Sequence, residues 1–268
     1  MKFAFSTLGC PDWTFPDMIS TAKDLGFDAI EIRGIENEVF APYAKPFKAE
    51  HIDKTISVLK EKSLEISMLS TGACVGVASH IESALGEATV YTDLAGRLGV
   101  KFIRVMITNK PQPEDADIEC AVNAYQRICD YAKEKGVTVL IETNGVLADS
   151  SVMADFMRRI GRENSGVLWD IHHPYRFFGE TPETTFKNIG EYVKYVHVKD
   201  SVFENGKVKY KMMGQGDVPV SGALKLLKDS GYSSFVTLEW VKRWCPELED
   251  AGIVFSHFSN YIRGVSQL

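Results

Sequence analysis

Helical and strand-like patterns alternate along the chain and are joined by small turn residues. In four places a helical stretch, a glycine and a short run rich in valine, isoleucine and phenylalanine follow one another: AKDLGFDAIEIRG, AGRLGVKFIRVMI, AKEKGVTVLIETN and LKDSGYSSFVTLEW. Gly26, Gly99, Gly136 and Gly231 stand at the position after a helix, where a left-handed backbone is favoured. The apolar run that follows is typical of a buried parallel strand. The pattern therefore predicts four helix-to-strand junctions.

Eight strands fit this pattern once Ser63, Gly166 and Gly190 are taken as further junctions. They are expected near residues 2–7, 28–33, 64–70, 101–107, 137–142, 166–170, 193–199 and 234–239. Helical patterns fill the gaps, although the one at 174–190 is weak. Eight alternating units predict a single (β/α)8 TIM barrel domain over residues 1–268. A doubly wound open sheet is the alternative, but it would be expected to carry a glycine-rich phosphate loop after the first strand, and STLGCPDW is no such loop.

Composition narrows the class of protein without changing this fold. The 268 residues are 45% hydrophobic and 25% charged, close to globular averages. A net charge of −6 argues against nucleic-acid binding, which normally needs a basic face. The five cysteines form no C-x-x-C pair and predict reduced thiols, and no segment is long and apolar enough to predict a membrane span. We expect a cytoplasmic protein that binds a small-molecule carbohydrate and neither nucleic acid nor a membrane. The sequence is compatible with both a monomer and a homo-oligomer.

Polar side chains stand at the ends of four consecutive predicted strands. They are Glu142, Asp170, His197 and Glu239. Taken singly, a strand-end carboxylate is more often a helix cap or an exposed residue, and a histidine in a strand can be a core residue. Because the strand ends of a barrel meet at one rim, the four groups together would repel and carry desolvation penalties unless a cation neutralised them. The set suits a divalent ion, with Mn²⁺ expected and Mg²⁺, Co²⁺ or Zn²⁺ as alternatives.

Nearly the whole chain resembles the xylose-isomerase-like TIM-barrel superfamily, in particular its sugar phosphate isomerase/epimerase branch. The resemblance is carried by the four strand-end residues, the Asp-x-x-His spacing of Asp170 and His173, the HVKD segment around His197 and the loop MGQGDVP at 213–219. It implies that one metal ion is bound by Glu142, Asp170, His197 and Glu239. It also implies that His173 faces the substrate.

Other positions bear on the substrate. Relatives that epimerise ketohexoses carry a glutamate and an arginine where this chain has Ala148 and Phe203, which argues against a ketohexose 3-epimerase. Glu31 after the second strand and Lys199 after His197 are further candidates for substrate binding. His172 is interpreted as a support or surface residue.

The resemblance implies a metal-dependent isomerase or epimerase that acts on a sugar or sugar-like polyol, phosphorylated or not. A metal chelated by a carbonyl oxygen and the neighbouring hydroxyl acidifies the C–H bond and stabilises an enediolate. Glu142 and Glu239 are then the expected catalytic proton-transfer groups. An inosose-type keto-polyol dehydratase is the alternative. A non-enzymatic carbohydrate-binding barrel and an abasic-site endonuclease are disfavoured, the first by the intact ligand set and the second by six histidines in an acidic chain.

Overall fold

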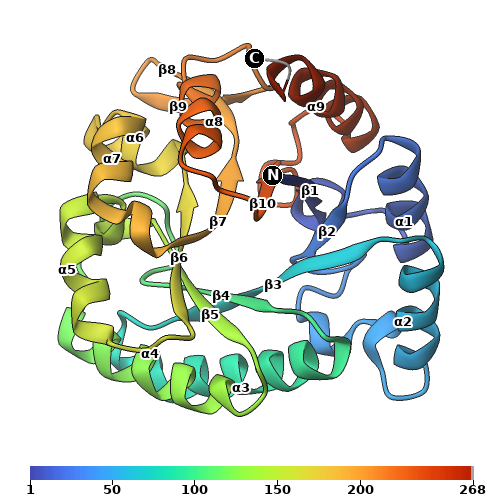
Figure 1. The fold of residues 1–268 in the computed structure, drawn as a ribbon, viewed down its shortest axis with the longest axis horizontal. Coiled ribbons are helices and arrows are strands. Elements are labelled where there is room, and N and C mark those ends of the chain that lie inside the picture. Colours follow the sequence, from blue (N-terminus) through green and yellow to red (C-terminus); the bar gives the residue numbers. More distant parts are fainter. Residues whose placement is uncertain (267–268) are drawn as a thin grey trace. The chain divides into compact units, whose positions relative to one another are not determined.

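The computed structural model describes residues 1–266 and contains a closed sheet of eight parallel strands (Figure 1). Neighbouring strands pair in the order β1-β10-β7-β6-β5-β4-β3-β2, and β2 pairs again with β1. The strands are β1 (Lys2–Ser6), β2 (Ala29–Ile32), β3 (Glu65–Cys74), β4 (Phe102–Met106), β5 (Thr138–Glu142), β6 (Ser165–Asp170), β7 (Val193–Val198) and β10 (Phe235–Leu238). The predicted (β/α)8 barrel is confirmed.

Helices alternate with these strands and fill the gaps in which helical patterns were expected. They are α1 (Phe15–Asp24), α2 (Ile52–Glu61), α3 (Ile81–Leu98), α4 (Ile118–Lys133), α5 (Ser150–Ile160), α6 (His172–Phe178), α7 (Pro182–Ile189), α8 (Val220–Asp229) and α9 (Ala251–Ser266). The four junction glycines all have positive φ angles, between 68° and 79°. Ser63, which takes the same role after α2, has a φ of 50°.

Two details of the sequence interpretation are wrong. Gly166 is not a turn residue but lies inside β6, where a Cβ atom would meet the Lys194 side chain at 2.6 Å. The left-handed turn before this strand is at Gly161, with a φ of 59°. An antiparallel hairpin that was not predicted follows β7 and is formed by β8 (Asp200–Glu204) and β9 (Lys207–Lys211).

The chain divides into two compact units. The first comprises Met1–Ser67 and His197–Leu268, and the second comprises Met68–Val196. In the first unit, phenylalanine rings pack α9 and the turn after α1 against β1: Phe5 stacks on Phe255 with 4.2 Å between ring centres and meets Phe27 edge-to-face at 5.2 Å. These rings are buried, so they remove a large apolar surface from water and hold the helices to the strand.

In the second unit α3 packs on β4 and α4 on β5, and α4 also contacts α5 (Figure 1). The hydroxyl of Tyr125 on α4 crosses into the sheet and donates to the carbonyl oxygens of Val139 at 2.7 Å and Gly166 at 3.2 Å. Tyr125 is fully buried, and burial raises its pKa well above the ordinary value, so the hydroxyl stays protonated. One phenol therefore links α4 to both β5 and β6.

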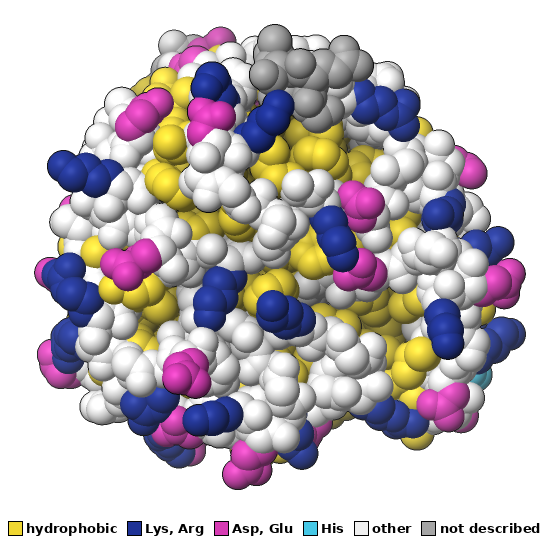
Figure 2. All heavy atoms as spheres, in the orientation of Figure 1, with side chains coloured by type: hydrophobic (Ala, Val, Ile, Leu, Met, Phe, Trp, Pro, Cys, Tyr) yellow, Lys and Arg dark blue, Asp and Glu magenta, His cyan; other side chains and the backbone are white. Residues whose placement is uncertain are grey.

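The surface carries charges of both signs. On the face drawn in Figure 2, lysine and arginine side chains alternate with aspartate and glutamate. None of the described helices has the length and apolarity needed to cross a membrane.

Replacing Tyr125 with Phe should lower the free energy of unfolding by about 1–3 kcal/mol, because buried backbone groups of β5 and β6 lose their partner. Urea unfolding followed by circular dichroism measures the change. Tyr131→Phe is the matched control: this hydroxyl donates to Asp93 at an exposed site, and its removal should cost less than about 0.5 kcal/mol. Equal effects of the two substitutions would refute the assigned role of Tyr125.

Candidate metal centre

In the second unit, two neighbouring strands end in buried carboxylates. Glu142 ends β5 and Asp170 ends β6, with 3% and 0% of their surfaces exposed. The Asp170 Oδ1 atom accepts the backbone N–H groups of His172 at 2.9 Å and His173 at 3.3 Å. Because the first N–H groups of a helix lack partners within it, this carboxylate stabilises the start of α6. The reversal from strand to helix thus fixes the Asp170 side chain.

The imidazole of His173 lies between oxygen atoms of both strands. Its Nδ1 atom is 2.9 Å from the carbonyl oxygen of Thr143, and since a carbonyl only accepts, Nδ1 is the donor. Its Nε2 atom lies 3.6 Å from Oδ2 of Asp170. A neutral ring with this tautomer turns the lone pair of Nε2 toward a carboxylate. Positive charge at this position would relieve the repulsion.

Arg104 on β4 supplies part of that charge. Its Nη1 atom donates to Oε2 of Glu142 at 3.0 Å, and both side chains are at least 95% buried. The sequence analysis missed this residue. The available signal was a lone arginine within the otherwise apolar strand FIRVM, since a charge in a buried strand requires a partner.

The first unit repeats this arrangement around His197. His197 on β7 is fully buried, and its Nε2 atom lies 2.6 Å from Oε2 of Glu31 on β2. Oε1 of Glu31 accepts the hydroxyl of Ser6 at 3.1 Å. The other ring nitrogen, Nδ1, lies 3.6 Å from Oε1 of Glu239, which directly follows β10. Glu31 therefore fixes which nitrogen of His197 is protonated and leaves Nδ1 facing a carboxylate.

Lys199 provides the cation of the first unit. Its Nζ atom donates to Oε2 of Glu239, and only 2% of its side chain is exposed. Oε2 of Glu239 thus contacts a buried ammonium, while Oε1 faces His197. Glu142 is held in the same way in the second unit, by Arg104.

The structure brings the predicted site residues together in two groups. Glu142, Asp170 and His173 lie together in the second unit, and Glu31, His197, Lys199 and Glu239 in the first. The substrate-binding roles of Glu31, Lys199 and His173 stay predictions. His172 is fully buried, so its interpretation as a surface residue is wrong. Asp170, His172 and His173 form a further cluster whose possible ligand atoms lie within 4.8 Å of one another.

Counting charges tests whether these residues fit a metal ion. In each group of described residues two buried carboxylates stand against one buried cation: Asp170 and Glu142 against Arg104, and Glu31 and Glu239 against Lys199. Each group therefore holds more buried carboxylates than buried lysine or arginine side chains. Oxygen-rich donor sets that include an imidazole suit divalent cations.

The glycine-rich loop at 213–219 binds the side chain of Asp200 through its backbone N–H groups. The backbone N–H groups of Gly214 and Gly216 donate to Oδ2 of Asp200 at 2.9 and 2.8 Å, and that of Val218 donates to Oδ1 at 3.2 Å. A Cβ atom on Gly216 would lie 2.1 Å from Oδ1 of Asp200, so only glycine fits there. The donors that could bind a phosphate are occupied by a carboxylate of the chain.

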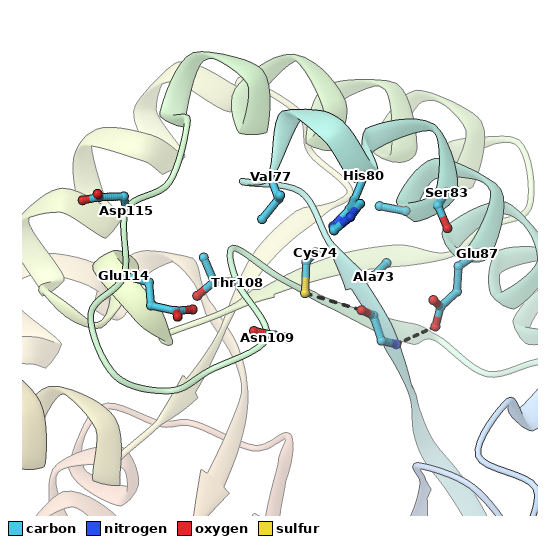
Figure 3. Close-up of a pocket in the computed structure, with 12 residues that line it drawn as sticks. Ala73, Cys74, Val77, His80, Ser83, Glu87, Thr108, Asn109, Glu114 and Asp115 are labelled. Atoms are coloured by element: carbon cyan, nitrogen blue, oxygen red, sulfur yellow. Dashed lines mark hydrogen bonds between the residues drawn. The ribbon is translucent and has the colours of Figure 1, made fainter.

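A cavity of about 630 Å³ lies at the ends of β3 and β4 in the second unit (Figure 3). Its lining includes Cys74, His80, Glu87, Thr108 and Asp115. Figure 3 shows these side chains coming from the end of β3, the start of α3 and the loop after β4. The carboxylates make the cavity acidic, and no lysine or arginine is among its described lining residues. The sequence pattern did not predict it, because its lining residues come from two distant stretches of the chain, 72–87 and 108–115.

A family model matches this chain. The model describes a xylose isomerase-like TIM barrel and covers residues 19–258, which include all of the candidate ligands. The chain belongs to the xylose isomerase-like TIM barrel family. Its membership confirms the resemblance inferred from the strand-end residues.

Relatives within the xylose isomerase-like family differ in their reactions. A 3-dehydroshikimate dehydratase of Bacillus anthracis is 23% identical, over 90% of this chain and 91% of the relative. A fructoselysine 3-epimerase of Escherichia coli O157:H7 is 20% identical, over 92% and 93%. An inosose isomerase of Bacillus licheniformis is 26% identical, over 81% and 83%. The relatives are thus isomerases, epimerases and dehydratases.

A solved structure supports the fold. The crystal structure of the IOLI protein with a bound zinc atom superposes with a TM-score of 0.82 at 18% identity, covering 100% of this chain and 99% of that one. At this identity the likeness establishes the barrel fold alone.

Arg104→Met should lower the free energy of unfolding of the metal-free protein by about 3–5 kcal/mol, because it leaves the Glu142 carboxylate buried without its partner. The double variant with Glu142→Gln should recover much of the loss, since a neutral amide replaces the charge. Lys110→Met, which breaks the exposed Lys110–Glu114 pair, should cost less than about 1 kcal/mol. Urea unfolding measures all three, and an Arg104→Met protein as stable as the parent would rule out the charge balance described.

Proposed function

We propose that this chain is a divalent-metal-dependent isomerase or epimerase of a sugar or sugar-like polyol. In this proposal Glu142, Asp170, His197 and Glu239 hold one cation, and the two units act as one catalytic domain. The observation that carries it is the donor set: each of the two groups places two buried carboxylates beside a buried imidazole, and one nitrogen of that imidazole already donates to an oxygen atom. Family membership adds support, because relatives of this chain act on sugars and polyols.

The bound cation would polarise a carbonyl oxygen of the substrate and so acidify the neighbouring C–H bond. Glu142 and Glu239 are the proposed acid and base, since each is a buried carboxylate at a strand end. Arg104 and Lys199 hold one oxygen of each glutamate, so both carboxylates keep a fixed orientation. A nearby positive charge also favours the ionised form, which is the form that accepts a proton.

Other residues would position the substrate. The Nδ1 atom of His173 donates to Thr143, so its ring is fixed, and Nε2 is the nitrogen proposed to contact a substrate hydroxyl. Lys199 is proposed to contact the substrate beside Glu239, and Glu31 to act through His197. The chemistry of the donor set favours Mn²⁺, with Mg²⁺, Co²⁺ or Zn²⁺ as alternatives. A cytoplasmic location and self-association stay predictions from the sequence.

A dehydratase acting on a keto-polyol is the second candidate. Proton removal beside a carbonyl can be followed by loss of a β-hydroxyl group, which needs an acid to protonate the departing oxygen. Lys199 provides a buried ammonium group in contact with Glu239 and supports this alternative. The 3-dehydroshikimate dehydratase among the relatives supports it as well.

The purified protein should bind about one divalent ion per chain. Asp170→Ala and His197→Ala should each weaken Mn²⁺ binding by at least about tenfold, because even the loss of a residue that only hydrogen-bonds to a metal ligand lowers metal affinity about tenfold or more. Calorimetric titration of metal-free protein measures this, with Asp155→Ala on the surface of α5 as the control. Unchanged binding by both alanine variants, with circular dichroism showing folded protein, would exclude the four-residue site.

Glu142→Gln and Glu239→Gln should each lower kcat by about 10²–10⁴-fold, because an amide keeps the shape of the side chain but cannot accept a proton. Activity is followed by proton NMR in D₂O on a panel of ketoses, aldoses and inososes with Mn²⁺. An isomerase or epimerase returns a product of unchanged mass apart from deuterium, whereas a dehydratase product is lighter by one water. Full activity in both variants would show that these glutamates do not transfer the proton.

A further inference from the structure

Arg243 lies in the loop between β10 and α9, and its hydrogen bonds join three loops of the first unit. Its backbone N–H donates to the carbonyl oxygen of Leu8 at 3.0 Å, and its Nη1 atom donates to the carbonyl oxygen of Glu36 at 2.9 Å. Leu8 follows β1 and Glu36 follows β2. These loops leave the carboxyl ends of their strands, the end at which TIM barrels bind substrates. A guanidinium group is thus fixed at the substrate-binding end, four residues after Glu239.

The remaining two nitrogens of this guanidinium group need a partner. Nε and Nη2 of Arg243 are buried, and neither has a hydrogen-bond partner among residues 1–266. They share one edge of the planar group, the edge that donates two parallel hydrogen bonds to a carboxylate or phosphate. Leaving buried donors of a charged group unsatisfied is costly. A bound anion would satisfy both nitrogens at once.

Neighbouring protein groups do not supply that anion. Burial raises the pKa of the Cys10 thiol well above its ordinary value, so Cys10 is neutral near pH 7. Burial also lowers the pKa of Arg243, against the opposing influence of Cys10 and Asp12. Asp12 acts on Arg243 through space, and no hydrogen bond joins the two in the part of the chain that the structure describes. The Nε–Nη2 edge is therefore not already used by a protein carboxylate.

The adjacent residue adds features that suit an anionic sugar. Trp244 is 54% exposed, and the guanidinium carbon of Arg33 lies 5.7 Å from the centre of its ring. An exposed indole ring offers an apolar surface to a sugar or cyclohexane face, and a second guanidinium adds positive charge. This contrasts with the acidic cavity of the second unit, which has no lysine or arginine among its described lining residues.

We propose that Arg243 binds an anionic substituent of the substrate, a carboxylate or a phosphate, through its Nε and Nη2 atoms. This inference rests on the proposed function and narrows its substrate class to keto-polyols that carry a negative charge. A neutral sugar would leave the Nε–Nη2 edge unsatisfied, so it would bind less tightly than an anionic one of similar size. Arg243 is a specificity-determining residue here and takes no part in proton transfer.

The test compares anionic and neutral ligands on Arg243→Gln and Arg243→Lys. Calorimetry measures the affinity of the Mn²⁺-loaded protein for 3-dehydroshikimate, which carries a carboxylate, and for inosose, which is neutral. Inorganic phosphate is titrated into metal-free protein, so that a metal ion does not contribute. Arg243→Gln should lower the ratio of anion to inosose affinity about 10- to 100-fold. Arg243→Lys keeps the charge but loses the paired donors, so its ratio should fall between those of the parent and the glutamine variant.

Lys209→Met, which removes one exposed positive charge from the β8–β9 hairpin, is the matched control and should leave the ratio unchanged. Comparing the effect of Arg243→Gln on the affinity for 3-dehydroshikimate and on the affinity for inorganic phosphate shows whether Arg243 prefers a carboxylate or a phosphate. If Arg243 only holds loops together, its variants should lower the melting temperature and weaken all ligands equally, and the proposal is wrong. It is equally wrong if the parent protein binds neither anion. Phosphate binding that depends on Arg243 without turnover of any sugar would instead reject the proposed reaction and retain the anion site.

Discussion

Burying carboxylates at the ends of β-strands is costly, and most features of the candidate centre reduce that cost. Asp170 accepts two backbone N–H groups, Glu142 contacts Arg104, and Glu239 contacts Lys199. The two groups are nevertheless rich in carboxylates, because each places two of them beside one buried cation: Glu142 and Asp170 beside Arg104, and Glu31 and Glu239 beside Lys199. A bound divalent cation would make the same residues stable and reactive at once. Asp200 shows the contrasting solution, in which backbone N–H groups of a glycine-rich loop neutralise a carboxylate without any cation.

The imidazoles of His173 and His197 are held in the same way. One ring nitrogen of each donates a hydrogen bond to an oxygen atom: that of His173 to Thr143, and that of His197 to Glu31. The second nitrogen then lies 3.6 Å from a carboxylate oxygen, of Asp170 or Glu239. Such an arrangement fixes the tautomer and the ring orientation before anything binds. The residues that fix each ring thus determine which atom is left for a ligand.

Much of the fold could be predicted from the sequence, because its causes are local. Glycines with positive φ end the helices, and apolar runs follow them, so the alternation of helices and strands can be predicted from the sequence. Gly166 was wrongly predicted as a turn residue, because the position requires glycine for another reason: the Lys194 side chain on the next strand, 28 residues later, leaves no room for a Cβ atom. Strand-end carboxylates were visible for the same local reason as the strands. Glu31 and His197, in contrast, are separated by 166 residues, and no pattern along the chain reveals their hydrogen bond. The environment of the Arg243 guanidinium group is formed by three loops that are distant in the sequence. Its two unsatisfied nitrogens therefore could not be predicted from the sequence either.

Whether the two half-sites converge on one ion is decided most directly by anomalous diffraction from crystals grown with Mn²⁺. We predict one manganese peak per chain, in contact with carboxylate oxygens of Glu142, Asp170 and Glu239 and with Nδ1 of His197. A peak at the cluster of Asp170, His172 and His173, without His197 and Glu239, would contradict it. So would crystals that hold manganese only at surface carboxylates.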